Sequence, residues 1–247
     1  MGKLSKRKTT MLILAILFVG LCAFALATKN VAFADETEIF AGGTGTKDDP
    51  YIIETSMQLN AVRNNLSASY KLNADIVFTE DDFAEGGEFY NEGKGWEPIG
   101  TYSAAFKGTF DGNGHIIKNL KSNQKGNPSA LFGLSKGSIM RLGMVDCNIV
   151  SDGYAAGICA CNDGKINECY VTGSIKSTDS GSGGIVGYSQ GMDYENEITN
   201  CYSGGKVSGS HAGGIVGAAG PYRRSVCIEY CYSTATVVGL VRGSIVG

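Results

Sequence analysis

The segment Gly183-Gly184-Ile185-Val186-Gly187 occurs again at residues 213–217 and, with serine in the second place, at residues 243–247. The final glycines of the three segments are each 30 residues apart. Two weaker copies precede them, at Ala130–Gly133 and Ala156–Ala160, with a spacing of 27 residues. A repeat of this length at a nearly fixed period indicates a solenoid, in which each repeat forms one coil.

A second element follows each of the first four copies and begins with isoleucine. Three residues after this isoleucine the chain always has leucine or cysteine. The four isoleucines are Ile139, Ile166, Ile198 and Ile228, and the residues that follow them in phase are Leu142, Cys169, Cys201 and Cys231. Two separate elements that keep one phase through four copies make a chance resemblance implausible.

The composition favours short strands joined by glycine-containing turns. The chain of 247 residues has 36 glycines and only 4 prolines, with a mean hydropathy of -0.02. A single coil cannot bury its apolar side, but stacked coils bury a continuous core. Their strands would pair in parallel, so that equivalent residues form columns. We expect one column of Leu131, Ile158, Ile185, Ile215 and Ile245, and another of Leu142, Cys169, Cys201 and Cys231.

The cysteine column leaves two interpretations open. Buried free cysteines behave as small apolar side chains, so a ladder of reduced thiols would pack well. Neighbouring coils also bring Cys169, Cys201 and Cys231 within the Cα range of a disulfide, although the torsion angles of that bond are strict. A structural zinc site needs four converging ligands, and Cys159-Ala160-Cys161 has no partner pair at a zinc-finger spacing. We therefore predict no metal and no cofactor.

The first 34 residues are typical of a secretory signal peptide. A basic start precedes an apolar run over Met11–Ala27, and Ala32-Phe33-Ala34 supplies a cleavage site before Asp35. An uncleaved membrane anchor is the alternative. Removing residues 1–34 takes away five of 21 basic residues and no acid, which leaves 16 against 24 and a formal charge of -8. This balance argues against nucleic acid as a partner. We predict a secreted or cell-surface protein.

Residues 35–95 differ from the repeats and are predicted to cap the β-helix. Ser56 can cap a helix over Met57–Leu66, and Tyr70–Phe78 has the alternating pattern of a strand. Such a helix and strand would cover the open strand edges at the N-terminal end. The sequence stops at Gly247, inside a repeat, so we expect residues 96–247 to be the first part of a longer array.

The repeats resemble the GLUG-motif repeats of bacterial secreted and cell-surface proteins. The resemblance rests on residues 183–187 followed by Ile198–Tyr202, and on the lead-in at Trp96–Gly100 and Phe106–His115. It implies an all-β, right-handed parallel β-helix and no particular reaction. Such repeats also occur in non-catalytic regions of some secreted IgA-cleaving metallopeptidases. The copy at 156–160 departs from the pattern because its final glycine is replaced by alanine.

A search for catalytic motifs finds none. The chain has no His-Glu-x-x-His zinc motif and no Gly-x-Ser-x-Gly nucleophile turn. Asp111-Gly112-Asn113-Gly114 begins like a calcium loop but lacks its next ligands, which favours a tight turn. Asp81, Asp82 and Glu85 could be a solvated acidic loop or an acid–base pair. We predict no catalytic residue in this chain.

Two features could bind a partner. The first is a stripe of tyrosines that would point outward because the cysteine before each points inward. The second is a pair of loops that are five residues longer than their counterparts and leave neighbouring coils at one edge. The alternatives are a tyrosine ladder that only stabilises strands and an ion pair between Asp193 and Arg223. The candidate residues are Tyr170, Tyr202, Tyr232, Asp193, Tyr194, Glu195, Tyr222, Arg223 and Arg224.

These observations predict a non-catalytic surface module for adhesion or for envelope or host interaction, with a cell-envelope or host glycan or protein as partner. The alternative is the N-terminal, non-catalytic region of a larger secreted enzyme, either an IgA-cleaving type of metallopeptidase or a polysaccharide-degrading enzyme. A polysaccharide lyase within the repeats themselves is a third reading.

Overall fold

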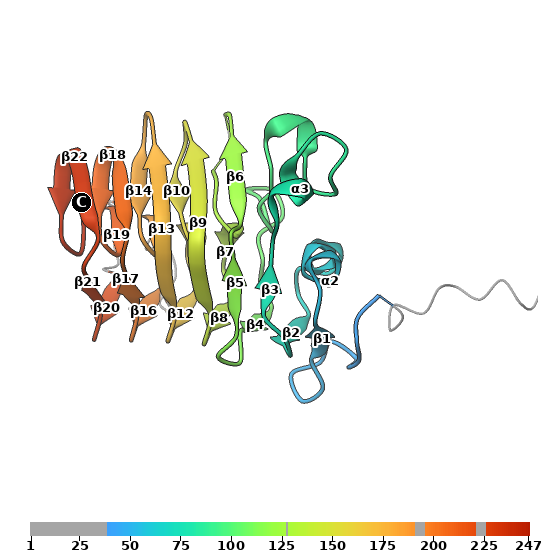
Figure 1. Ribbon diagram of the computed structural model, residues 1–247. Coiled ribbons are helices and arrows are strands. Elements are labelled where there is room, and N and C mark those ends of the chain that lie inside the picture. The colour runs from blue at the N-terminus through green and yellow to red at the C-terminus, as the bar shows by residue number, and fades with distance from the viewer. Residues whose placement is uncertain (1–38, 127, 191–195, 221–225) are drawn as a thin grey trace, which may run out of the picture. The chain divides into compact units, whose positions relative to one another are not determined.

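Short strands from successive coils lie side by side in three parallel sheets (Figure 1). The computed structural model describes residues 39–126, 128–190, 196–220 and 226–247. The described chain belongs to one unit that spans Ile39–Gly247. Among the strand pairs that form the sheets, every neighbour is parallel, as expected where each coil lies on the previous one.

The first sheet has one strand from each of seven successive levels. Its order follows the chain, so each strand pairs with its equivalents before and after it. The strands are β1 (Tyr51–Ile53), β2 (Ser69–Leu72), β4 (Thr109–Asp111), β8 (Ser138–Met140), β12 (Lys165–Asn167), β16 (Glu197–Thr199) and β20 (Cys227–Glu229).

The second sheet is the largest and contains the longest strands. Its members are β3 (Ile76–Val77), β5 (Ile116–Lys118), β6 (Lys121–Gln124), β9 (Gly143–Ser151), β10 (Ala155–Ala156), β13 (Tyr170–Ser177), β14 (Gly181–Gly183), β17 (Tyr202–Ser203), β18 (Lys206–Gly213), β21 (Tyr232–Ser233) and β22 (Thr236–Gly243). The third sheet consists of β7 (Phe132–Ser135), β11 (Cys159–Asn162), β15 (Val186–Ser189) and β19 (Val216–Ala219).

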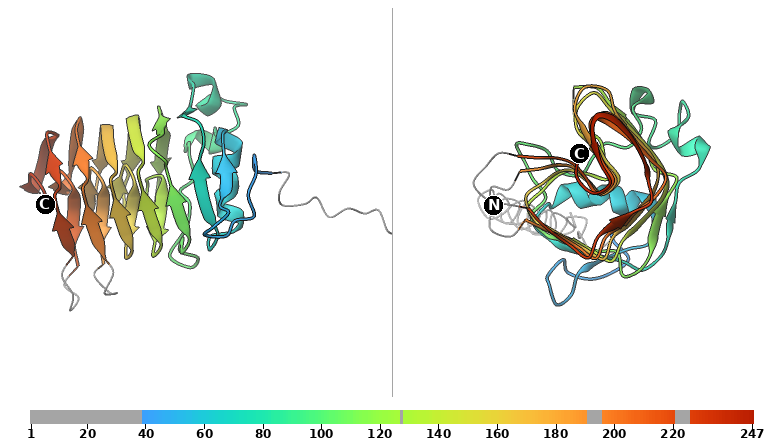
Figure 2. Two further views of the ribbon diagram at one scale, coloured as in Figure 1. Left: turned by 90° about the horizontal axis from the view of Figure 1, so that it is seen from below. Right: turned by 90° about the vertical axis from the view of Figure 1, so that its left-hand side faces the viewer.

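The coils wind in a right-handed sense. Seen from the C-terminal end, the chain rises along the second sheet, crosses over and returns along the third sheet as it approaches the viewer (Figure 2). Right-handed crossovers are the rule for parallel strands because of the twist of each strand. The predicted all-β, right-handed parallel β-helix is confirmed.

Both predicted columns are present. Val186 is in register with Cys159 and Val216, which aligns the preceding residues Ile158, Ile185 and Ile215. These three isoleucines have no exposed surface. Their burial in one stack supplies the apolar driving force that one coil cannot provide.

The cysteine column lies on the same core, at the corner between the first and second sheets. Tyr170, Tyr202 and Tyr232 pair in register, which stacks the cysteines that precede them. Cys169 and Cys201 are buried and Cys231 is half-buried. All seven cysteines among the described residues are free thiols, in agreement with the reduced ladder.

The glycine motif forms a sharp corner at which the chain turns from the second sheet into the third. A Cβ placed on Gly183 would lie 1.8 Å from the carbonyl oxygen of Val186 and 2.7 Å from the amide nitrogen of Gly217. Gly213 has the same close contact with the carbonyl of Val216. The first glycine is therefore required because the backbone of the next strand occupies the space of a side chain.

In the earlier copy at residues 156–160, alanines occupy the same corner. Ala156 is in register with Gly183, and it packs with Ala130 and Ala160 in a small buried cluster. This turn therefore departs from the repeat pattern, as expected. Contacts between small methyl groups replace the direct contact of a glycine with the neighbouring backbone.

The N-terminal segment differs from the predicted cap in two respects. The helix α2 runs only over Ser56–Ala61 and continues as the 3-10 turn η3 over Val62–Asn64; its N-cap is Thr55, whose hydroxyl accepts from the amide of Gln58 at 3.2 Å. Ser56 is thus the first helical residue rather than the cap. Leu59 and Val62 are fully buried, and the helix crosses the section of the solenoid (Figure 2).

The predicted single strand over 70–78 is wrong. It is two strands, β2 and β3, which belong to different sheets and are separated by a corner at 73–75. The alternation of inward and outward side chains continues through this corner, because Leu72 and Ile76 both point into the core. Since β1 pairs with β2 and β2 pairs with β4, the segment already contributes levels to the first sheet.

One corner repeats an unusual backbone conformation. Arg141, Glu168, Asn200 and Tyr230 each have a positive φ of 53° or 54°. All four follow the strands of the first sheet in successive coils, directly before the column of Leu142 and the cysteines. Asparagine adopts this left-handed conformation readily, whereas the other three side chains are strained by it.

Candidate functional site

The three predicted tyrosines form a column on the outer side of the solenoid. Tyr170 and Tyr232 are exposed by 37% and 60%, and Tyr202 between them is half-buried. The rings of Tyr202 and Tyr232 lie 4.6 Å apart between centroids, and the Tyr202 hydroxyl is 3.0 Å from that of Thr234. The ring of Tyr170 lies over Gly143, where a Cβ would meet it at 2.4 Å. The column offers aromatic surface to a partner and also contacts its own neighbours.

The two longer loops begin and end in register. Ser189 pairs with Ala219 before the loops, and Glu197 pairs with Cys227 after them. They therefore leave the same edge of adjacent coils, as the sequence predicts. The loop residues proposed for binding lie outside the described residues; they are Asp193, Tyr194, Glu195, Tyr222, Arg223 and Arg224.

The sequence reasoning missed a second aromatic cluster. Tyr154 and Tyr188 stack with centroids 4.7 Å apart and planes 17° from parallel. The hydroxyl of Tyr102 lies 3.1 Å from the thiol of Cys161, and burial together with this hydrogen bond raises the pKa of Tyr102. The two stacked tyrosines occupy different positions in neighbouring repeats, so a search for columns could not pair them.

Tyr102 also forms one wall of a cavity of about 140 Å³ at the N-terminal part of the solenoid. The other walls are Pro98, Pro128 and Leu134, with Glu97 and Gln124 supplying polar groups. Cavities that bind small molecules usually combine apolar walls with a few polar groups in this way. No motif in the sequence marks this site, because its residues come from four separate segments.

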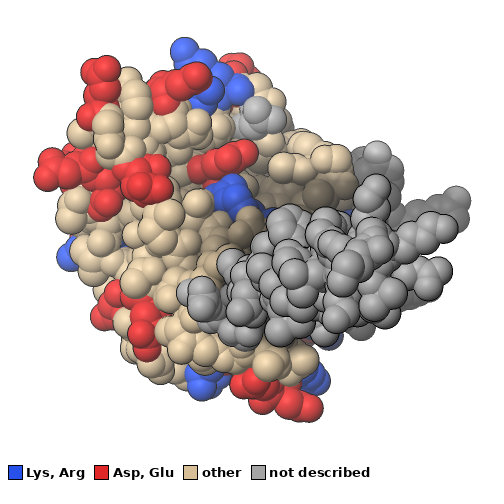
Figure 3. Space-filling model, turned by 90° about the vertical axis from the view of Figure 1, so that its right-hand side faces the viewer, with Lys and Arg blue, Asp and Glu red and all other residues tan. Residues whose placement is uncertain are grey.

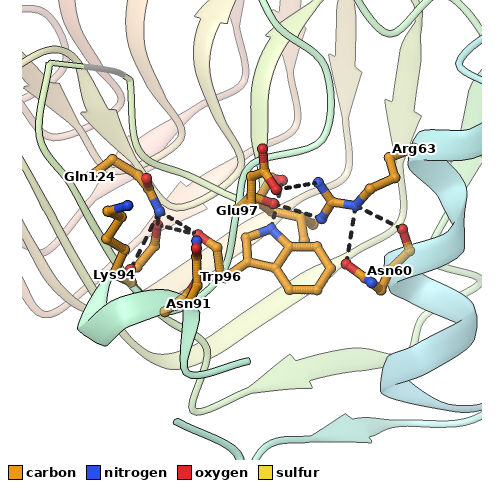
Figure 4. A network of polar contacts seen from close by, with 10 residues as sticks. Asn60, Arg63, Asn91, Lys94, Trp96, Glu97 and Gln124 are labelled. Carbon is orange, nitrogen blue, oxygen red and sulfur yellow. Dashed lines mark hydrogen bonds and ion pairs between the residues drawn. The ribbon is translucent and has the colours of Figure 1, made fainter. Parts of the chain in front are cut away.

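A network of polar contacts fixes the wall of this cavity (Figure 4). Arg63 donates to the backbone carbonyl of Glu97 at 2.8 Å and lies 3.6 Å from its carboxylate. The same guanidinium lies over the indole ring of Trp96, 5.3 Å from its centroid. Burial lowers the pKa of Arg63, and Glu97 opposes this change. Because Arg63 is also held by Asn60, the segment around Glu97 is rigidly placed.

Trp96 anchors the network from inside. Its indole nitrogen donates to the carbonyl of Leu131 at 3.1 Å. Its own carbonyl accepts from the hydroxyl of Ser122 at 2.7 Å and from the amide of Gln124 at 2.9 Å. The ring is fully buried against Phe78 and Phe89. These contacts join three segments into one preformed wall.

The acidic segment after β3 begins as the short helix α3 (Glu80–Phe83). Asp82 accepts from the backbone amide of Thr79 at 2.7 Å and so closes a capping box. Glu80 pairs with Lys121. On the visible face of the N-terminal end, acidic side chains outnumber basic ones (Figure 3). Asp82 thus has a structural use, while Asp81 lines an open hollow with Lys94 and Asn148.

Within the described residues, no group of three or more His, Cys, Asp or Glu side chains could hold a metal ion. The segment 111–114 is a tight turn, in which the amide of Asn113 donates to Asp111 at 2.8 Å. Asp111 is also paired with Arg141 of the next coil. Over the same described part of the chain, no helix has the length and apolar character needed to cross a membrane.

Comparison with known proteins supports the fold and gives a partial indication of function. No protein-family model matches the chain. A "Putative Gly-rich membrane protein" of Evansella cellulosilytica is 37% identical over 126 residues, which are 49% of this chain and 14% of that protein. "Halomucin" of Haloquadratum walsbyi is 33% identical over 170 residues, which are 65% of this chain and 2% of that protein.

A solved structure has the same architecture. It is described as a putative immunoglobulin A1 protease from Bacteroides ovatus, with a TM-score of 0.67 and 28% identity. The similarity covers 85% of this chain and 64% of that chain. This chain therefore spans only part of each protein that it resembles. Taken with the fold, the comparisons fit a surface-associated β-helical module.

Proposed function

We propose that the chain is a non-catalytic β-helical module of a secreted or cell-surface protein, of the GLUG-repeat type, that serves adhesion or contact with the cell envelope or a host. The tyrosine column is the observation that carries this proposal. Three aromatic side chains in register, two of them well exposed, form a regular outer stripe. Tyrosine is favoured at binding surfaces because it supplies a large rigid contact area and a hydroxyl. The relation to a membrane protein supports a location at the surface.

The longer loops extend the proposed binding surface. They leave the edge between Ser189 and Glu197 in one coil and between Ala219 and Cys227 in the next. Loops that project from one edge of a repeat array are common binding elements. Deleting residues 191–195 and 221–225 would restore the six-residue spacing of the first two copies and would leave every described strand in place.

The experiment measures retention of the secreted chain on two surfaces, immobilised mucin and purified peptidoglycan. A variant with Tyr170→Ala, Tyr202→Ala and Tyr232→Ala is compared with Tyr230→Ala, which removes an exposed tyrosine outside the column. We expect the triple variant and the loop-shortened variant to bind at least about fivefold more weakly, a loss near 1 kcal/mol. Unchanged retention of both variants on both surfaces would contradict the proposal.

A second candidate is the non-catalytic part of a larger secreted enzyme, either a peptidase or a polysaccharide-degrading enzyme. The similarity to the Bacteroides ovatus structure favours the first of these. The mass of the native secreted product separates the candidates. A mass that matches residues 35–247 would support the display module, whereas a much larger product with cleaving activity would support the enzyme. Activity of the isolated chain on acidic glycans would instead favour a lyase within the repeats.

A further inference from the structure

We propose that the cavity between Pro98, Tyr102 and Gln124 binds one uncharged hexopyranose unit of a glycan. This site is separate from the tyrosine column and does not depend on the function proposed for it. It lies in the first coils, where the polar network around Trp96 holds its wall in place. Preformed walls lower the entropic cost of binding, because few side chains must be ordered by the ligand.

Gln124 supplies the first argument for a polar ligand. Its side chain lines the cavity, although the residue is only 6% exposed. The amide nitrogen donates to the carbonyls of Trp96 at 2.9 Å and Lys94 at 3.3 Å, which fixes the orientation of the amide (Figure 4). The oxygen of the same amide can accept a hydrogen bond from a ligand hydroxyl, because the side chain lines the cavity.

The apolar walls supply the second argument. Pro98, Pro128 and Leu134 present hydrocarbon surface, and the exposed ring of Tyr102 faces the same cavity. The hydrogen bond between the Tyr102 hydroxyl and Cys161 holds this ring in position. A pyranose ring has both characters that the cavity requires, since its C–H face packs on aromatic and proline surfaces while its hydroxyls donate hydrogen bonds.

Charge and size further restrict the class of ligand that the cavity can bind. The carboxylate of Glu97 lies at the exposed rim and would repel an acidic sugar, while it can accept from a hydroxyl. Arg63, which pairs with Glu97, is also engaged by Asn60 and the Trp96 ring. The volume of about 140 Å³ is below that of typical drug-binding cavities, which begin near 300 Å³. It therefore suits one sugar ring rather than a longer segment.

The experiment uses the fluorescence of Trp96, the single tryptophan of the chain, as a reporter beside the cavity. The full secreted chain is titrated with methyl glucoside, methyl galactoside and N-acetylglucosamine, and separately with glucuronate and n-butylamine. We expect a saturable response to at least one neutral sugar, with a dissociation constant on the order of 1–10 mM. Glucuronate should bind at least about fivefold more weakly, because of Glu97.

Three variants test the assignment. Tyr102→Ala, at an exposed position, and Gln124→Met, which removes the acceptor, should each weaken sugar binding at least about fivefold. Tyr230→Ala, at an exposed position outside both the cavity and the tyrosine column, should leave sugar binding unchanged. Circular dichroism verifies that the variants are folded. No response to any neutral sugar, equal affinity in Tyr102→Ala, or a response to the acid or the amine alone would overturn the proposal. None of these outcomes would change the retention of the chain on mucin or peptidoglycan that is expected from the tyrosine column.

Discussion

The N-terminal and C-terminal halves of this solenoid bury their cores in different ways. The largest fully buried side chains all lie before residue 133, and they include Trp96, Phe106 and Phe132. After that point the core consists mainly of isoleucine, valine, cysteine and alanine, stacked in columns. The cavity beside Trp96 is lined by residues between 97 and 134, and the open hollow beside Asp81 by residues between 80 and 150. Uniform columns give uniform coils, whereas irregular coils with large side chains leave room for a pocket.

The largest effect is expected from Trp96→Ala in the irregular half. This change removes a fully buried ring and its hydrogen bond to Leu131, so it should lower the free energy of unfolding by about 3–5 kcal/mol. A smaller truncation in the repeats, Ile185→Val, should cost about 1 kcal/mol. Chemical denaturation followed by circular dichroism compares the two variants. Equal losses would contradict the expectation that the buried ring of Trp96 contributes more to stability than one methyl group of a column isoleucine.

Gly183→Ala tests the regular half and should destabilise the protein by about 1–3 kcal/mol. The new methyl group would meet the carbonyl oxygen of Val186 and the backbone of Gly217, neither of which can move as a flexible side chain could. The control is Ala156→Gly, at the equivalent position of an earlier coil. It should cost no more than about 1 kcal/mol. The measurement is thermal unfolding, and a neutral Gly183→Ala variant would refute the requirement for glycine at this corner.

Raising the pH should lower the stability of the repeat half, by a loss that is small near pH 9 and grows as the pH rises further. The hydrogen bond with Cys169 raises the pKa of Cys201 to about 12, and burial raises the pKa of Cys147 to about 12. The unfolded chain loses these thiol protons near pH 8.5. Stability contributed by the protonated thiols is therefore complete below about pH 8.5 and falls as the pH rises toward 12, by up to about 1.4 kcal/mol per unit for each group.

Thermal unfolding between pH 7 and pH 11 measures this decline by circular dichroism, while Trp96 fluorescence reports the N-terminal half. The double variant Cys147→Ala, Cys201→Ala should show a flatter profile than the unmodified chain. At pH 7, a thiol reagent should modify the exposed Cys227 well before the buried cysteines. A decline that is identical in the variant would exclude these thiols as its cause.

Much of the repeat half could be predicted from the sequence. Because the repeats stack, equivalent positions have the same surroundings in every coil, and the same kinds of residue recur there. The phase of Ile185 and Cys201 with their counterparts was sufficient to place both columns. The N-terminal half has no such redundancy. There the corner between β2 and β3 conceals a change of sheet within a continuous alternating pattern, since Leu72 and Ile76 remain inward on both sides of it.

The candidate sites divide in the same way. The outward column of Tyr170, Tyr202 and Tyr232 follows from alternation beside the cysteines. The cavity beside Trp96 could not be predicted, because Tyr102 lies outside the strands and Gln124 takes the place that serine occupies in the following coils, Ser151 and Ser177. The pairing of Tyr154 with Tyr188 was equally hidden, since it joins unlike positions of two neighbouring repeats.

The corner at which four residues have a positive φ has a consequence for the evolution of the sequence. Arg141, Glu168, Asn200 and Tyr230 show that one backbone geometry accepts a cation, an anion, an amide and a phenol in turn. Adjacent coils set these groups at intervals of about 4.8 Å. The side chain at each of these corner positions can therefore be exchanged one at a time, while the backbone and the spacing between the coils stay the same.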